Sequence, residues 1–202
     1  TDLPSPEDRC GMSLHMFEDL LSIGAPGASV AGDASGLGMV YQYSPSAGTW
    51  RKWATIVPGG GDSGDFFGMS TAIGGVGVVF ASPNMGPFGT NTGLGLLYEM
   101  PEGIDGDWQE DTRASVPVIA ERGMIEAPDD VRDGSSQFGR GLAAAGDHAL
   151  IGDPDNRVVH AYSRSSAGAA WTEVHQLPYP DDNAIPEDFG AFIEMVDDLA
   201  II

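Results

Sequence analysis

Most of the residues that could do chemistry in this chain are carboxylates, and nine of the thirty fall in four short clusters. The clusters are Asp62 with Asp65, Asp105 with Asp107, Asp129 with Asp130 and Asp133, and Asp181 with Asp182. Carboxylate oxygens are preferred ligands of Ca²⁺, which takes about six to eight oxygens. Acidic residues are also ordinary, solvated members of loops and turns. The sequence therefore predicts solvated loops, with Asp129, Asp130 and Asp133 as weak candidates for a metal site.

Other chemical signatures are missing from the sequence. The four histidines show no metal-ligand spacing; they are His15, His148, His160 and His175. No Gly-x-Ser-x-Gly sequence is present, and Gly59-Gly60-Gly61 lacks the Lys-Ser/Thr pair of a phosphate-binding loop. We therefore predict no catalytic residue and no cofactor.

The elements that must position these residues come as a repeat. Each copy opens on Phe-Gly or Cys-Gly, continues through two short apolar runs, and closes on two small residues and a proline. The repeat units are approximately residues 10–66, 67–137, 138–188 and 189–202. The fourth copy places Glu194 at the position of His15 and stops at Ile202 before its own closing motif. Self-similarity at this scale indicates a repeat architecture.

Short apolar runs separated by turn residues predict four strands in each unit. In the first unit we expect strands at 12–16, 20–23, 37–43 and 50–57, joined first by a Glu18-Asp19 turn. The second unit is expected to follow with 67–73, 76–81 and 95–100, and with Trp108 at the place of Trp50. In the third unit 157–162 is the expected third strand, with His160 at the Tyr41 position and Trp171 opening the fourth. Residues 111–136 are read as an insertion after the fourth strand of the second unit.

Four-stranded units of this size cannot bury both faces alone, but they do so when stacked radially as blades. The predicted fold is therefore an all-β β-propeller of four-stranded antiparallel blades. Structural roles follow for the repeated residues: Phe67 and Phe138 fill the space between blades, and the glycine after each permits close backbone approach or a strained turn. The tryptophans cover the blade edge or pack under the next blade, and the prolines end strands. The repeat residues are Gly24, Pro26, Trp50, Phe67, Gly68, Pro83, Trp108, Phe138, Gly139, Pro154, Trp171, Phe189 and Gly190.

Phe-Gly at the start and a Gly-Ala-Pro-like end resemble the FG-GAP repeat of integrin α-subunit-type propellers. The resemblance covers nearly the whole chain and implies a propeller, commonly seven-bladed, that serves adhesion, ligand binding or subunit contact. Many FG-GAP blades carry an Asp-rich calcium loop in the first hairpin. Here the corresponding turns have only two residues, at 18–19, 74–75, 146–147 and 197–198. Two residues cannot supply a calcium shell, so the chain resembles the calcium-free variant of the repeat.

Charge narrows the possible partners. Nine Lys and Arg against thirty Asp and Glu give a net charge of −21, which disfavours nucleic acid and anionic lipid surfaces. No apolar run is long enough to span a membrane. The single cysteine, Cys10, stands where other copies have Phe, so we expect a buried structural thiol; a disulfide to residues outside the chain is the alternative.

These observations favour a non-enzymatic interaction or adhesion module in a larger extracellular, cell-surface or secretory-lumen assembly. Its partners would be other protein subunits or further blades of the same polypeptide. The alternative is an accessory propeller domain of a hydrolytic or lipid-processing enzyme whose catalytic part lies outside this chain. Three units and the start of a fourth are fewer than a closed propeller uses. We therefore expect residues 1–202 to be a single, partial propeller.

Overall fold

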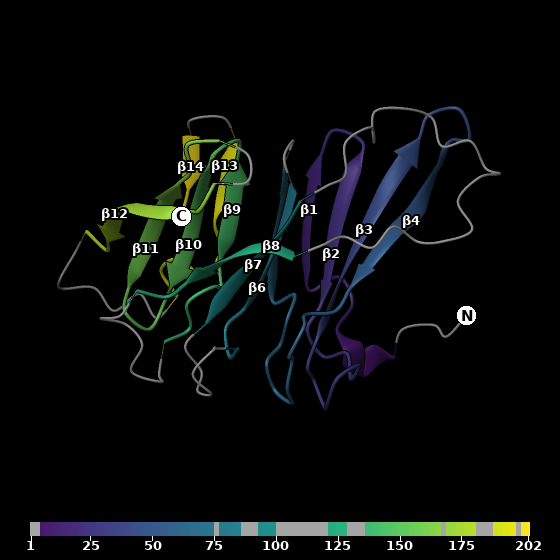
Figure 1. Ribbon diagram of the computed structural model, residues 1–202, viewed down its shortest axis with the longest axis horizontal. Coiled ribbons are helices and arrows are strands. Elements are labelled where there is room, and N and C mark those ends of the chain that lie inside the picture. Colours follow the sequence, from purple (N-terminus) through teal and green to yellow (C-terminus); the bar gives the residue numbers. More distant parts are fainter. Residues whose placement is uncertain are drawn as a thin grey trace.

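The computed structural model describes residues 5–74, 77–85, 93–99, 121–128, 136–166, 169–180, 188–196 and 199–202. These residues are almost entirely β-structure, with one 3₁₀ turn at Pro6–Asp8 (Figure 1). Unit 1 contains β1 (Ser13–Phe17), β2 (Leu20–Ala25), β3 (Leu37–Ser44) and β4 (Thr49–Ile56). Unit 2 contains β5 (Ser70–Gly74), β6 (Gly77–Ser82), β7 (Leu94–Glu99) and β8 (Glu121–Glu126). Unit 3 contains β9 (Leu142–Ala145), β10 (His148–Asp153), β11 (Val158–Ser163) and β12 (Thr172–Pro178), and unit 4 contains β13 (Glu194–Val196) and β14 (Leu199–Ile201).

Each unit is one antiparallel sheet whose strands pair in sequence order. Units 1, 2 and 3 are four-stranded, and the described part of unit 4 is a two-stranded hairpin. The first strands of the units lie next to one another, with β1 beside β5, β5 beside β9 and β9 beside β13. The sheets spread outward from these strands, β4 and β12 lying far from the centre (Figure 1). The prediction of an all-β chain with four-stranded antiparallel units is therefore confirmed, but the described residues form no closed propeller.

The core lies between consecutive sheets. Between units 1 and 2, buried Val40, Trp53 and Ile56 pack with Phe67 and Phe80. Between units 2 and 3, a second cluster joins Val79 and Ile125 to Phe138, Ile151 and Tyr162. The unit 3 to unit 4 junction contains Ala143, Leu150, Val159, Ile193 and Met195. Because strand side chains alternate between faces, each sheet uses one face toward the preceding unit and the other toward the following unit.

The two halves of the repeat motif are joined by a backbone hydrogen bond. Gly11 N–H donates to the Gly24 carbonyl, Gly68 N–H to Ala81 and Gly139 N–H to Gly152, with N···O distances of 3.0, 2.9 and 2.9 Å. These opening glycines have φ between +82° and +94°, as does Gly190. Such a backbone conformation is strained for residues with a Cβ. This explains why a glycine opens every copy.

The fourth strand of unit 2 lies elsewhere than expected. β8 spans Glu121–Glu126 and pairs with β7 from Tyr98↔Glu121 to Leu94↔Glu126. The sequence prediction had placed this strand at Trp108, which lies outside the described residues, and had treated 111–136 as an insertion after it. The prediction was wrong because the extra residues precede the fourth strand, between β7 and β8. The β5–β6 turn was also misplaced by one residue: Gly74 pairs with Gly77, which leaves 75–76 rather than 74–75 between the strands.

Register also corrects the third strand of unit 3. Tyr162 lies opposite Ala149, just as Tyr41 lies opposite Leu21 and Tyr98 opposite Val78. Each partner lies five residues before the closing proline, so the three tyrosines hold the same position in their sheets. His160 does not replace Tyr41 but stands two residues earlier, at the position of Met39, opposite Ile151. Residues two apart in a strand point to the same face of the sheet, so the two alignments look alike in the sequence.

Cys10 is exposed rather than buried. Its counterparts Phe67 and Phe138 are fully buried because a preceding sheet packs over them. Unit 1 has no preceding sheet among the described residues, so the same position faces solvent. The expectation of a buried structural thiol was wrong for this reason.

Candidate functional site

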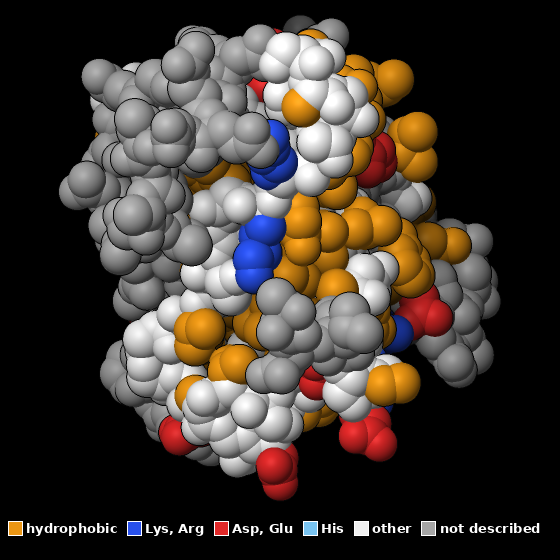
Figure 2. All heavy atoms as spheres, turned by 90° about the vertical axis from the view of Figure 1, so that its right-hand side faces the viewer, with side chains coloured by type: hydrophobic (Ala, Val, Ile, Leu, Met, Phe, Trp, Pro, Cys, Tyr) orange, Lys and Arg blue, Asp and Glu red, His pale blue; other side chains and the backbone are white. Residues whose placement is uncertain are grey.

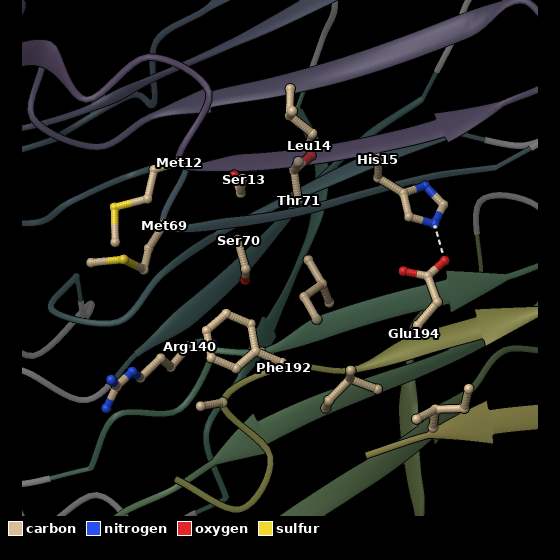
Figure 3. A pocket seen from close by; sticks show the side chains of 15 residues that line it. Met12, Ser13, Leu14, His15, Met69, Ser70, Thr71, Arg140, Phe192 and Glu194 are labelled. Carbon is tan, nitrogen blue, oxygen red and sulfur yellow. Dashed lines mark ion pairs between the residues drawn. The ribbon is translucent and has the colours of Figure 1, made fainter.

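A cavity of about 320 Å³ opens where the first strands of the four units converge (Figure 3). Its apolar lining includes Met12, Met69, Leu142, Phe192 and Ile201. We call this cavity the axial pocket. Side chains from β1, β5, β9 and β13 or their N-terminal flanks contribute to it, because the sheets meet along these strands. Residues almost two hundred positions apart therefore share one site.

His15 and Glu194 form the polar end of the axial pocket. The Ile73 N–H donates to Nδ1 of His15 at 3.2 Å, and Nε2 of His15 lies 3.4 Å from Oε1 of Glu194 (Figure 3). Because Nδ1 accepts a hydrogen bond, the ring proton of a neutral imidazole resides on Nε2 and points to the carboxylate. A single side chain of β1 thus links units 1, 2 and 4.

Arg140 brings a cation to the pocket lining. Its Nη1 donates to Oε1 of Gln137 at 2.8 Å, and its Nη2 lies 3.3 Å from Oδ1 of Asp188. Both the Arg140 and Asp188 side chains are partly exposed, 38% and 63%, so this ion pair contributes little to stability. Two partners, Gln137 at the end of unit 2 and Asp188 at the end of unit 3, already orient the guanidinium.

The pocket hydroxyls donate to backbone carbonyls rather than to a base. Ser13 Oγ donates to the Gly68 carbonyl at 2.9 Å, Ser70 Oγ to Gly139 at 2.6 Å and Thr71 Oγ1 to Val79 at 3.2 Å. Activation of a hydroxyl nucleophile requires its proton to face a general base. This arrangement suits non-covalent binding of a largely apolar group more than bond-making chemistry.

Of the two acidic cluster residues that the structure describes, Asp65 is buried, at 8% exposure, and Asp62 is exposed. Its Oδ2 accepts the Asp62 N–H at 2.6 Å, so the pair forms a loop contact rather than a metal shell. Burial raises the pKa of the Asp65 carboxyl, the Asp62 hydrogen bond lowers it, and the Asp62 charge raises it further.

The remaining predicted acidic residues lie outside the described residues: Asp105, Asp107, Asp129, Asp130, Asp133, Asp181 and Asp182. Within the described ranges, no group of three or more His, Cys, Asp or Glu side chains is placed to hold a metal ion.

The other histidines lie apart from the axial pocket. His160 is fully buried and its Nδ1 lies 2.7 Å from Oε1 of Glu173. Its ring meets Phe138 edge-on with centroids 5.4 Å apart. His148 and His175 are exposed. His160 therefore belongs to the packed junction between units 2 and 3.

The predicted repeat residues occupy the unit junctions and strand ends. Phe67 and Phe138 are fully buried, and Phe189 packs at the unit 3 to unit 4 junction with its ring 5.3 Å from Tyr179. The prolines that follow β2, β6 and β10 are all buried: Pro26, Pro83 and Pro154. A Cβ on Gly24 would collide with the Gly68 carbonyl, which explains the small residue there.

The tryptophans divide into two roles. Trp50 is 39% exposed and lies against Tyr43, with ring centroids 5.4 Å apart. Trp171 holds the corresponding place beside Arg164, whose guanidinium carbon lies 5.0 Å from the ring centroid. Sequence reasoning missed Trp53, which is 2% exposed and packs at the junction between units 1 and 2. The period-2 pattern of β4 could have found it, since Trp53 is three residues from Trp50 and so faces the opposite side.

No sheet formed by the described residues covers the two end faces of the molecule. We define the front face as the unit 1 surface that carries Leu14, Met16, Ile23, Met39 and Tyr41, which pair in register on one side of the sheet. Leu14 and Met16 are 59% and 62% exposed. Figure 2 looks at the unit 1 end of the molecule and shows hydrophobic side chains gathered there beside basic ones.

The back face is the corresponding open surface of unit 4. It carries Glu194, Val196, Leu199 and Ile201, which pair across the β13–β14 hairpin on one side. Val196, Leu199 and Ile201 are 63%, 70% and 69% exposed. The opposite side, with Met195, packs on unit 3.

Comparison with known proteins gives no assignment: no family model matches this sequence, and no curated protein matches it. Among the described residues, no helix has the length and apolar character needed to cross a membrane.

Proposed function

We propose that this chain is a non-enzymatic interaction or adhesion module, a β-propeller segment of the FG-GAP, integrin α-like type without the calcium loops. The proposal rests on the contrast between the buried junctions that join the units and the exposed end faces of the molecule. Ile73 and Phe80 of unit 2 are fully buried against unit 1. Their register counterparts on the front face, Met16 and Ile23, have no sheet over them among the described residues. Exposed apolar faces of this kind mark interaction sites.

The partners are other protein subunits or further β-sheet blades of the same polypeptide, in an extracellular, cell-surface or secretory-lumen assembly. The net charge of −21 opposes nucleic acid binding. The axial pocket adds a second binding feature, because its hydroxyls are engaged with carbonyls and its lining is mainly apolar. Neither feature calls for a cofactor.

The alternative is an accessory propeller domain beside a hydrolytic or lipid-processing catalytic domain. The same end faces would then dock on that domain. The mass of the native polypeptide and the sequence outside residues 1–202 separate these readings: a catalytic motif there favours the alternative. A native mass near 21.1 kDa with a monomer in solution would contradict both the larger-propeller proposal and the accessory-domain reading.

Site-specific photo-crosslinking in the producing cells tests the proposal. A benzophenone amino acid is placed at Met16 on the front face, at Leu199 on the back face, and at Val30, an exposed loop position, as a control. We expect Met16 and Leu199 to give covalent adducts with one reproducible partner that mass spectrometry identifies, and Val30 to give none. Recovery of the uncrosslinked chain alone from all three positions would overturn the proposal.

A further inference from the structure

We propose that copies of the 202-residue chain dock head to tail, with the back face of unit 4 in one copy against the front face of unit 1 in the next. This inference rests on the proposed function, because it names the partner of the same two end faces. It concerns the 202-residue chain by itself.

The internal junctions supply the template. At every junction the back side of one unit packs against the front side of the next. Ile73 and Phe80 of unit 2 meet Val40 and Ile56 of unit 1. Leu142 and Ile151 of unit 3 meet Val79 of unit 2. The packing rule is the same although the side chains differ.

The front face carries the register counterparts of these buried residues. Leu14 pairs with Ile23, as Thr71 pairs with Phe80 and Leu142 with Ile151. Met16 pairs with Leu21, as Ile73 pairs with Val78. Among the described residues no sheet covers this surface of unit 1, and Leu14 and Met16 are exposed there, whereas units 2 and 3 bury the equivalent surface.

The back face is the matching half. Val196 pairs with Leu199, and Glu194 pairs with Ile201, so the three apolar side chains lie on the side facing away from unit 3. Burying apolar side chains that are about two-thirds exposed is favourable by the hydrophobic effect. A sheet face of this size and polarity would fit β1 and β2 of a second copy.

Faces that differ from each other make a heterologous contact, which closes into a ring or continues as a chain of copies. The net charge of −21 per copy opposes this contact by long-range repulsion. Because salt screens that repulsion and leaves apolar burial intact, association should strengthen as NaCl increases. A contact held by ion pairs would weaken instead.

Sedimentation of the purified chain tests the inference at protein concentrations up to about 100 µM. The variants are Met16→Glu for the front face, Leu199→Glu for the back face, and Val30→Glu as the control of equal charge. All three positions are exposed, at 62%, 70% and 48%, so each variant should retain the far-UV spectrum and melting temperature of the parent.

We expect the parent and Val30→Glu to self-associate and each face variant alone to sediment as a monomer. An equimolar mixture of the two face variants retains one intact front face and one intact back face. It should therefore form a dimer and nothing larger. A monomeric parent, a face variant that still associates, a monomeric mixture, or weaker association at high NaCl would each overturn the inference. None of these outcomes changes the crosslinking test of the proposed function, which identifies whatever protein covers these faces in the producing cells.

Discussion

His15 and Glu194 hold the same position of the repeat in units 1 and 4, and their side chains meet with Nε2 of His15 3.4 Å from Oε1 of Glu194. The corresponding residues of units 2 and 3 are Ala72 and Ala143, which are fully buried. Equivalent positions of the first strands converge because those strands line one axis. Of the four units, only units 1 and 4 carry an ionisable side chain at this repeat position.

The two members of this pair should differ sharply in their effect on stability. His15→Ala removes the acceptor of the Ile73 N–H in a buried strand, and we expect the free energy of unfolding to fall by about 1–3 kcal/mol. Glu194→Gln keeps an acceptor for Nε2, and the side chain is 59% exposed, so the change should stay within about 0.5 kcal/mol. Urea unfolding measures the free energy of unfolding of both variants. Equal losses would contradict the different contacts of His15 and Glu194.

Substitution of two motif glycines, Gly11 and Gly68, distinguishes the cost of backbone strain from the cost of a steric clash. Gly11 and Gly68 have φ of +86° and +84°, but a Cβ on Gly11 meets nothing within 4 Å, whereas one on Gly68 meets the Leu37 carbonyl oxygen at 2.6 Å. We expect Gly11→Ala to cost about 1–2 kcal/mol from conformation alone and Gly68→Ala to cost clearly more. Chemical denaturation measures both. A larger loss for Gly11→Ala would refute the proposed role of Gly68 at the junction.

Asp65 should make stability decrease as the pH rises. Its folded-state pKa is raised by burial above the ordinary value of 3.8, so the folded protein binds this proton more tightly than the unfolded chain. The contribution is therefore fully present below pH 3.8 and is lost as the pH rises through the folded-state pKa. Asp65→Asn retains an acceptor for the Asp62 N–H and should raise the melting temperature at pH 7 by about 1–3 °C. The gain should vanish near pH 3; a gain that is independent of pH would rule out this origin.

Cys10 should react in the native protein, but slowly at neutral pH. Its thiol is exposed, while local burial and then the Asp8 charge raise its pKa. Only the thiolate is nucleophilic, so alkylation by iodoacetamide should reach one equivalent without denaturant and accelerate as the pH increases. Labelling that requires denaturant would show that the thiol is covered in solution. Asp8→Asn should speed the reaction at neutral pH.

Calcium chelation should change the melting temperature by less than about 1 °C. The described hairpins β1–β2 and β9–β10 are joined by two residues each, too few to wrap an ion that needs about six to eight oxygens. Thermal unfolding with and without EDTA, each with Mg²⁺ present as a control for ionic strength, measures the shift. A large loss of stability would direct attention to Asp129, Asp130 and Asp133.

Local pattern was enough to predict the sheets, because each strand pairs with its sequence neighbour. The closing motifs also located the strand ends at Pro26, Pro83 and Pro154, since proline cannot continue a ladder. The fourth strand of unit 2 is not predictable from Trp108, because β8 begins only at Glu121. A side chain that recurs in the repeats does not locate a strand when a long connection precedes that strand.

The axial pocket was harder to predict because it depends on how sheets are arranged. The alignment of the repeats gives Glu194 and His15 the same repeat position. They are in contact only because β1 and β13 converge. Cys10 failed for a related reason: burial at its position comes from a neighbouring sheet and not from the local sequence. The periodicity of the sequence does not predict contacts between separate sheets.

The opening glycines of units 2 and 3 form hydrogen bonds through both their N–H and their carbonyl groups. Within the unit, the N–H of Gly68 or Gly139 binds the closing motif; across the junction, its carbonyl accepts the hydroxyl of Ser13 or Ser70 from the unit before. A unit therefore cannot lose its own turn without also releasing its neighbour's hydroxyl. For a growing polypeptide, the same property means that each newly made unit completes the one made before it. Folding of the array would then advance from the N-terminus in steps, and a duplicated unit that kept this glycine and this serine could be inserted without changing the joints on either side.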